Sequence, residues 1–428
     1  RDCDMVSRNV LSGVFFREYA AMNRPLEGIR VLAIEQMQAL PYATQLMGRL
    51  GAEIVKVEHP KTGESARGAL PAVADVDGEQ VGATYLRNSL NKKSICIDLK
   101  SEEGVALIKR LVPHFDVVGE NFKPNTMKRL GLGYADLAPL HPGLVYVSVS
   151  GFGNLTESPY ATWPAYAVVA EAMGGFLESA RRDDEPPRPG AAGALGDIGS
   201  SLFAAIGTLA ALRERDRSGR GQHVDISMFD AMVAMADVVP FFWSMGVRGT
   251  RRGATGGIVA PFKARDGWFV MQAVREHHLA IFARAVGHPE WLDDERFSDR
   301  SGWSVHLEDV IRPAVEAWAS TRSKLEICAE LCGQGIAAGP CLSAEDIIAD
   351  PHVNAHGMIC EIPRPDADEA LMVVGNPIKL SETPEVPDDR WPTLGQHTDE
   401  ILQKDLGLET SELESLREAG VIRSGPTP

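Results

Sequence analysis

The first part of the chain alternates short apolar runs with segments of helical periodicity. The runs at 29–35 and 53–58 flank a helical segment at 43–50, and together they predict a strand–helix–strand unit. The alternation then continues, with a helix that begins at Ser101. Further strands are predicted at 94–99, from 116–118 onward, and at 144–150. This order predicts a Rossmann-like large α/β domain with a mainly parallel sheet, whose ligands lie beyond the carboxyl ends of the strands.

The later part of the chain predicts a second, smaller α+β domain, because 428 residues are too many for one ordinary domain. After Asp197 we expect a helix that ends in the polar, glycine-containing stretch 213–221. The next predicted elements are a strand at 222–227, a helix at 229–245 and a strand at 268–272. We divide the chain into an N-terminal extension at 1–21, a large domain at 22–215, a small domain at 230–330, and a C-terminal part at 335–428 that returns to the large domain.

Composition restricts the possible partners. Apolar residues make up 44% of the chain and charged residues 24%, which is normal for a globular protein. The net charge of −16 argues against nucleic-acid binding, because a phosphate backbone needs a positive surface. No G-x-G-x-x-G motif follows a predicted strand, which disfavours a nicotinamide dinucleotide. We also expect no metal site.

The cysteines and the apolar runs indicate a cellular setting. Six cysteines are scattered without a C-x-x-C pair, as expected for reduced thiols in a cytoplasmic protein. No uniformly apolar run approaches the roughly 18 residues of a membrane span, so we expect no membrane association. Residues 1–21 lack the pattern of a signal peptide.

Asp197 is the candidate nucleophile. It lies in a segment of small residues, 190–201, directly before an apolar helical run. The first N–H groups and the positive end of that helix would hold its carboxylate ionised. Glycines around it would let a bulky ligand approach, and they are Gly190, Gly193, Gly196 and Gly199. The alternative is that Asp197 only caps the helix.

Positive residues are concentrated between 87 and 129, in a chain that is otherwise acidic. Several of them follow predicted strands, where lysine and arginine could bind a polyphosphate. The alternative is a solvated helix face, which we accept for Lys109 and Arg110. The members of this basic cluster are Arg87, Lys92, Lys93, Lys100, Lys109, Arg110, Lys123, Lys128 and Arg129.

Short motifs follow one another in a specific order and spacing between Pro25 and about Val421. They are PLEGIRVL at 25–32, LGAEIVKVE at 50–58, NKKSICIDLK at 91–100, VGENFKP at 118–124, LGD at 195–197, SGRGQ at 218–222 and LGQHTD at 394–399. In these motifs the chain resembles the class III CoA-transferases, which include formyl-CoA transferase and carnitine CoA-transferase, with alpha-methylacyl-CoA racemase as a relative.

The resemblance implies a function and a site. It implies transfer of CoA from an acyl-CoA to a free carboxylic acid, with Asp197 forming an aspartyl anhydride and an aspartyl-CoA thioester. Gln38 would hydrogen-bond the reacting oxygen, and Gln38 and Ala39 would line the junction of thioester and nucleophile. CoA is then a substrate, with no permanently bound cofactor. The further positions matched to CoA contacts are His59, Arg67, Ile97, Lys100, Asn121, Phe122, Thr126, Arg129 and Tyr166; for Ile97 and Phe122 the alternative is plain core.

The chain departs from the family pattern at three places. Tyr166 stands where the racemase relatives have a proton-shuttling histidine, and a tyrosine is a poor base at neutral pH. Ala167 stands where many members have an acidic residue. Glu171, one helical turn on, could substitute for it, and the alternative, which we expect, is an inert glutamate on the helix surface. The glycine pair 256–257 is shorter than the loop that shields the anhydride in formyl-CoA transferase, so 258–262 or a partner subunit would have to exclude water.

The resemblance also implies an interlocked homodimer. Two alternatives to CoA transfer stay open, namely an acyl-CoA isomerase or racemase and a non-catalytic acyl-CoA-binding protein. The identity of the acid is not encoded in the motifs. Arg181, Arg182 or Arg251 could pair with the second carboxylate of a dicarboxylic acid.

Overall fold

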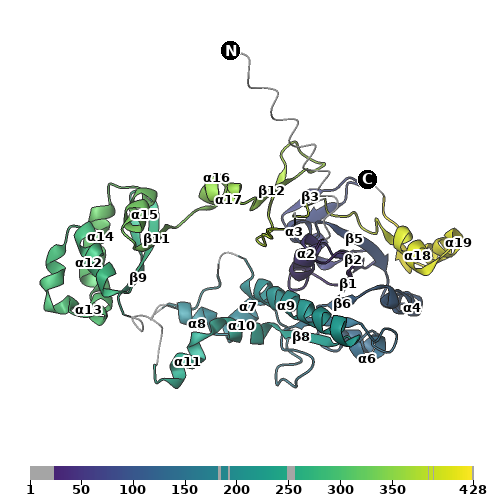
Figure 1. The fold of residues 1–428 in the computed structure, drawn as a ribbon. Coiled ribbons are helices and arrows are strands. Elements are labelled where there is room, and N and C mark those ends of the chain that lie inside the picture. Colours follow the sequence, from purple (N-terminus) through teal and green to yellow (C-terminus); the bar gives the residue numbers. More distant parts are fainter. Residues whose placement is uncertain are drawn as a thin grey trace, which may run out of the picture. The chain divides into compact units, whose positions relative to one another are not determined.

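A computed structural model describes residues 24–181, 185–190, 193–247, 256–383, 385–388 and 390–426 (Figure 1). The chain divides into two compact units. The large unit comprises Arg1–Val238 and His356–Pro428, and the small unit comprises Val239–Ala355. The sequence placed the small domain at 230–330, and the N-terminal extension expected at 1–21 lies outside the described residues.

The large unit is built on a seven-stranded sheet in the order β14-β5-β2-β1-β6-β7-β8. All neighbours are parallel except β14 and β5, which are antiparallel, so the predicted mainly parallel sheet is confirmed. The strands are β1 Arg30–Ile34, β2 Glu53–Glu58, β5 Lys92–Ile97, β6 Val117–Glu120, β7 Val145–Ser150, β8 His223–Ser227 and β14 Ile422–Arg423. Successive strands run outward in both directions from β1, which makes the carboxyl ends of β1 and β6 the natural ligand crevice.

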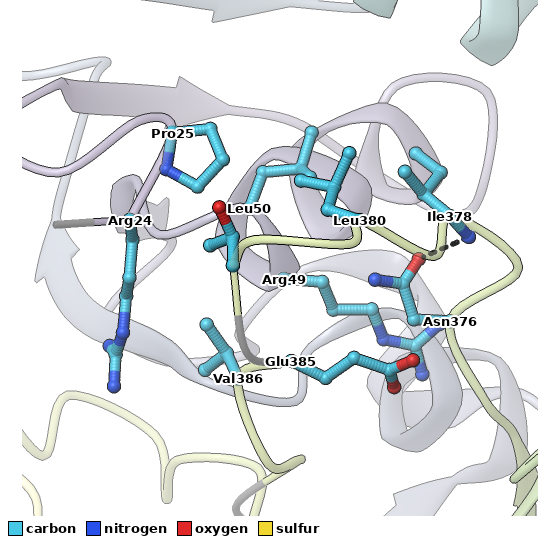
Figure 2. Close-up of a pocket in the computed structure, with 10 residues that line it drawn as sticks. Arg24, Pro25, Arg49, Leu50, Asn376, Ile378, Leu380, Glu385 and Val386 are labelled. Carbon is cyan, nitrogen blue, oxygen red and sulfur yellow. Dashed lines mark hydrogen bonds between the residues drawn. The ribbon is translucent and has the colours of Figure 1, made fainter. Parts of the chain in front are cut away.

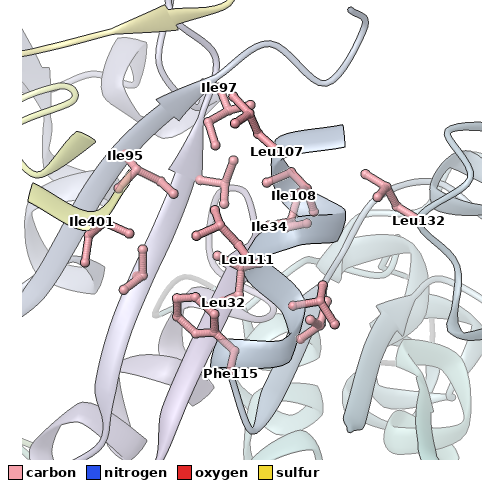
Figure 3. Close-up of a cluster of buried hydrophobic side chains, with 14 of the residues drawn as sticks. Leu32, Ile34, Ile95, Ile97, Leu107, Ile108, Leu111, Phe115, Leu132 and Ile401 are labelled. Atoms are coloured by element: carbon pink, nitrogen blue, oxygen red, sulfur yellow. The ribbon is translucent and has the colours of Figure 1, made fainter. Parts of the chain in front are cut away.

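Helices cover both faces of this sheet. On one face α4, α18 and α19 pack over alternate strand residues, in a core that Figure 3 shows around Leu32, Ile34 and Ile95. On the other face α2, α9 and α10 pack over the intervening residues, including Val31 and Ala33. The helices are α2 Pro41–Arg49, α3 Ala83–Asn88, α4 Glu102–Leu111, α5 Thr126–Arg129, α6 Tyr134–Leu137, α7 Ala167–Met173, α8 Phe176–Ala180, α9 Leu195–Ser218, α10 Met228–Ala236, α18 Thr398–Leu406 and α19 Thr410–Glu418.

Helix α9 begins at Leu195, two residues before Asp197 rather than after it, and Gly219 ends it in the left-handed region. One side of α9 packs on the sheet, while an apolar stripe on it is exposed. This α9 stripe consists of Leu195, Leu202, Phe203, Ile206 and Leu209. By length and composition α9 could cross a membrane, contrary to the expectation from the sequence, but half of the apolar window is buried inside the protein. A core helix has the same composition, so this is weak evidence for a span.

The small unit has a three-stranded antiparallel sheet in the order β11-β10-β9, packed on helices. The segment 258–262 lies in β9, where buried and exposed residues alternate. The helices and longer strands of the small unit are β9 Ile258–Ala264, β10 Gly267–Ala273, β11 Ala337–Pro340, α12 Glu276–Ala285, α13 Arg300–Val305, α14 Arg312–Ala319, α15 Lys324–Gly333, α16 Ala344–Ala349 and α17 Pro351–Ala355.

The remaining elements are short. The helix predicted at 229–245 is two helices, α10 and α11 Val238–Ser244, because Asp237 has a φ of 36° that interrupts the helical backbone. Two hairpins complete the described chain: β3 Ala72–Ala74 with β4 Gln80–Gly82, and β12 Ile359–Ile362 with β13 Leu371–Val374.

Candidate active site

Asp197 is the third residue of α9 and is half-buried. The residue that precedes the helix is Ala194, which offers no side-chain cap. Within the described part of the chain, no hydrogen bond or ion pair reaches the Asp197 carboxylate. The capping alternative is therefore wrong, and the carboxylate oxygens are available for chemistry.

The pKa of Asp197 is raised from 3.8 to about 6, chiefly by burial and next by the nearby Glu171, while Arg87 opposes the rise. The sequence had suggested that the helix end would favour the ionised form. Burial and a like charge outweigh that effect here. With a pKa of about 6, roughly nine in ten molecules still carry an ionised Asp197 at pH 7.

Glu171 lies against the start of α9, and the expectation that it lies on the helix surface is wrong. Its side chain is only 8% exposed, and its Oε1 accepts the Gly196 N–H at 3.0 Å. Gly196 brings the helices close, because a Cβ there would stand 2.7 Å from the Ala167 carbonyl oxygen. The structure thus places a buried carboxylate one turn beyond Ala167 on α7, and its substitution for the missing acidic residue stays a prediction.

The loop after β1 is held in place from a neighbouring strand. The side chain of Asn121, which follows β6, accepts the Gln36 N–H at 2.7 Å and donates to the Gln36 carbonyl at 2.8 Å. Met37 has a φ of 59°, an unusual value for a residue with a side chain, and its N–H donates to Glu64 Oε2 at 3.1 Å. These contacts fix the direction in which the chain enters Gln38.

Gln38, Ala39 and Asp197 are brought together by Ser201. The Ser201 hydroxyl is buried on the first turns of α9. It lies 2.7 Å from the backbone carbonyl oxygen of Ala39 and 2.8 Å from the backbone carbonyl oxygen of Asp197. The Gln38 carbonyl lies 3.3 Å from the same hydroxyl. The structure thus joins the two residues predicted to line the reaction centre to the helical turn that carries the candidate nucleophile.

Arg87 on α3 determines which way the Gln38 amide points. Its Nη2 donates to Gln38 Oε1 at 2.5 Å. A guanidinium can only donate, so the amide oxygen must face it, and the two Nε2 hydrogens of Gln38 remain for another acceptor. This orientation fits the predicted role of Gln38 as a donor to a reacting oxygen.

Three residues matched to CoA contacts lie near the ends of β2 and β5. Arg67 is buried and forms two hydrogen bonds with Glu58, at 2.6 and 2.8 Å. Ile97 is 1% exposed and belongs to the core around α4, the placement that the core alternative described. His59 is half-buried, with Nδ1 3.2 Å from the Lys61 N–H nitrogen.

The other matched residues lie nearer the surface. Phe122 is partly buried against the core around α4, and Lys100 is exposed after β5. Arg129 Nη2 donates to Thr126 Oγ1 at 3.1 Å within α5. Tyr166, directly before α7, is 73% exposed. For all these residues, contact with CoA stays a prediction.

Lys92 does not belong to a surface phosphate site. Its ammonium group is buried, and it donates at 2.7 Å to both Glu35 Oε1 and Thr44 Oγ1. Lys56, also buried, lies 3.4 Å from the same Glu35 oxygen. The positive charges of Lys92 and Lys56 are thus compensated by Glu35 in the protein interior. Lys92 therefore does not belong to the surface basic cluster.

A small pocket in the large unit lies away from these residues (Figure 2). It is lined by the start of the described chain, the end of α2 and the segment 376–386. Arg49 beside it is held by Asp388 and by the Val374 and Gly375 carbonyls, so it anchors the C-terminal part of the chain on α2. Across the described residues, no group of three potential ligands is placed to hold a metal ion.

Comparison with known proteins decides the family. The model of CoA-transferase family III matches residues 26–398. The chain belongs to CoA-transferase family III. This family III enzyme is 37% identical to the succinyl-CoA–D-citramalate CoA-transferase of Chloroflexus aurantiacus, over 93% of this chain and 98% of the relative.

Other family III relatives match at similar levels. The succinyl-CoA:mesaconate CoA-transferase of Haloarcula hispanica is 33% identical, over 91% of this chain and 99% of the relative. The formyl-CoA:oxalate CoA-transferase of Streptomyces avermitilis is 33% identical, over 94% and 100%. The crystal structure of a CAIB/BAIF family protein from Brucella suis matches with a TM-score of 0.78 and 30% identity, over 90% of this chain and all of that one. The recognition from motifs and the assignment as a CoA-transferase are confirmed.

Proposed function

We propose that this enzyme moves CoA from an acyl-CoA donor to a free carboxylic acid through covalent intermediates on Asp197. The observation that carries the proposal is a half-buried carboxylate with no hydrogen-bond partner among the described residues, set beside an oriented Gln38 amide. CoA enters and leaves as a substrate, and no permanently bound cofactor takes part.

The proposed steps exchange two acyl bonds without net proton transfer. An Asp197 oxygen attacks the thioester carbonyl, the carbon–sulfur bond breaks, and a mixed anhydride and CoA thiolate form. The thiolate then attacks the Asp197 carbonyl carbon, which releases the donor acid and leaves an aspartyl-CoA thioester. The acceptor carboxylate attacks this thioester and expels the thiolate. Attack of the thiolate on the acceptor carbonyl finally gives the new acyl-CoA and restores Asp197.

The surroundings of Asp197 support its role as nucleophile. A carboxylate whose pKa is raised to about 6 is a better nucleophile than an ordinary aspartate and is still mostly ionised at neutral pH. The Nε2 hydrogens of Gln38 are available for the oxyanion that develops on a reacting carbonyl. Both residues are fixed to one helical turn through Ser201.

The test is Asp197→Asn compared with the native enzyme. We expect loss of turnover with CoA binding retained, and a mass increase corresponding to an acyl or CoA adduct on Asp197 of the native chain after incubation with acyl-CoA. Hydroxylamine should remove the adduct. A fully active Asp197→Asn enzyme would reject the proposal. A panel of acids tested with succinyl-CoA and acetyl-CoA would identify the substrates.

No observation favours the isomerase or racemase alternative. Tyr166 takes the position of the relatives' histidine, and it is largely exposed. An isomerase would exchange the α-hydrogen of its acyl-CoA with deuterium from the solvent and would need no acceptor acid. A non-catalytic binding protein would bind acyl-CoA without transfer to any acid.

We further propose a homodimer in the cytoplasm. The α9 stripe exposes apolar side chains that a second copy of the chain would cover. Light scattering on the purified protein should give twice the mass of one chain. Replacing Ile206, which is 63% exposed, with aspartate should lower that mass. A monomeric native protein would contradict the dimer.

A further inference from the structure

Arg87 is a cation next to the proposed reaction centre, and the described residues provide no ion-pair partner for it. It lies near the end of α3, its side chain is partly exposed, and among the described residues it donates one hydrogen bond, to Gln38 Oε1. No carboxylate of the described residues lies within ion-pair distance of it. Asp197 is close enough to favour the charged form of Arg87 electrostatically, although burial lowers the Arg87 pKa.

We propose that Arg87 binds the free carboxylate of a dicarboxylic substrate while the other end of that substrate reacts at Asp197. This inference rests on the proposed function and assigns its substrate class. In an acyl-CoA donor, the same guanidinium would hold the carboxylate that is not part of the thioester. In an acceptor, it would hold the carboxylate that does not attack.

The hydrogen-bonding capacity of Arg87 fits this role. A guanidinium has five N–H donors, of which Gln38 takes one. The remaining donors can form the paired hydrogen bonds that a carboxylate prefers. Arg87 and Asp197 influence each other electrostatically but form no ion pair within the described part of the chain, so both charges are available to one ligand.

The negative charge of the molecule favours a cation at this site for an anionic substrate. The chain carries a net charge of −16, and both Asp197 and Glu171 are acidic groups at the site. A dianionic acid would be repelled unless a positive group met it there. Lys92 is buried in ion pairs, and Arg181 pairs with Glu178 at 2.7 Å, so neither is free for this task. Arg182 and Arg251, also considered from the sequence, lie outside the described residues.

The experiment compares acids of equal length that differ in one carboxylate. The pairs are succinate and butyrate with acetyl-CoA as donor, and glutarate and valerate with succinyl-CoA. In a ping-pong reaction, kcat/KM for the acceptor depends only on the second half-reaction. A slower reaction of the variant with the donor therefore does not affect this value. The variants are Arg87→Gln and Arg87→Lys, with Lys109→Gln, a surface member of the same basic cluster, as the charge-matched control.

We expect the native enzyme to prefer the dicarboxylate of each pair. Arg87→Gln should lower kcat/KM for the dicarboxylate by about 10- to 100-fold more than for the monocarboxylate, as expected for the loss of one charge-assisted contact. The smaller loss for the monocarboxylate reports the Gln38 amide, which Arg87 no longer orients. Arg87→Lys should keep part of the preference, and Lys109→Gln all of it. Equal losses for both acids in Arg87→Gln, or a native enzyme without a preference, would overturn the inference. These outcomes differ from failure of the proposed function, which is absence of transfer to every acid or an active Asp197→Asn enzyme.

Discussion

Replacing Glu171 with glutamine should make Asp197 a stronger acid without disturbing the fold. The pKa of Asp197 rises from 3.8 to about 6, which corresponds to about 3 kcal/mol against the ionised form. Burial is the larger cause and Glu171 the second, so we assign about 1 kcal/mol to the charge of Glu171. Glutamine keeps the volume and an amide oxygen that can accept the Gly196 N–H, and it removes only the charge.

The assay is the pH dependence of kcat/KM for the acyl-CoA donor, whose acid limb reports ionisation of the free enzyme. The native limb should lie near pH 6, where Asp197 titrates. In Glu171→Gln it should lie about 0.5 to 1 pH unit lower, because the ionised Asp197 no longer meets a like charge. Glu178→Gln, an exposed glutamate on the neighbouring α8, is the matched control and should leave the limb in place. An unchanged or higher limb in Glu171→Gln would refute the reasoning.

Other substitutions test the fold around the site. Asp197→Asn should stabilise the protein by about 1 to 3 kcal/mol at pH 7.5 and by almost nothing at pH 3.5. The reason is that the pKa of Asp197 is higher in the folded protein, so its ionisation lowers the free energy of unfolding as the pH rises from 3.8 through 6. Thermal unfolding at both pH values would measure the difference. Lys92→Met should lower the free energy of unfolding by about 3 kcal/mol or more, measured in urea, because it leaves Glu35 short of a buried partner. Gly196→Ala should lower the melting temperature and the activity by forcing α7 away from α9, whereas Gly333→Ala, with open space around it, should change neither.

The fold could be read from the sequence where the pattern is local. The alternation of apolar and polar residues located β2 correctly at Glu53–Glu58, and Ser101 caps α4 as predicted. The break at Asp237 was missed, because a continuous apolar run carries no sign of one residue with positive φ.

The site could be read only in part, because its arrangement depends on contacts between distant residues. Short motifs predicted Asp197 and Gln38 as site residues. They could not show that Glu171 accepts a backbone N–H from a residue 25 positions away, nor that Arg87 reaches Gln38 across 49 positions. Lys92 was taken for a surface cation because its partner Glu35 lies 57 positions earlier. Arg87 was visible in the sequence as a basic residue, but the function proposed for it depends on the geometry.

The placement of β14 determines when the large unit can be completed during synthesis. The outer edge of β5 pairs with Ile422 and Arg423, and the Asp98 N–H donates to the Val421 carbonyl at 2.8 Å. A ribosome-bound chain that has just exposed the small unit therefore still has an open strand edge at β5, together with the apolar surface that α18 and α19 later cover. Completion of the large unit must therefore wait until Ile422 and Arg423 have left the ribosome, and a chain truncated before Ile422 would keep an aggregation-prone strand edge.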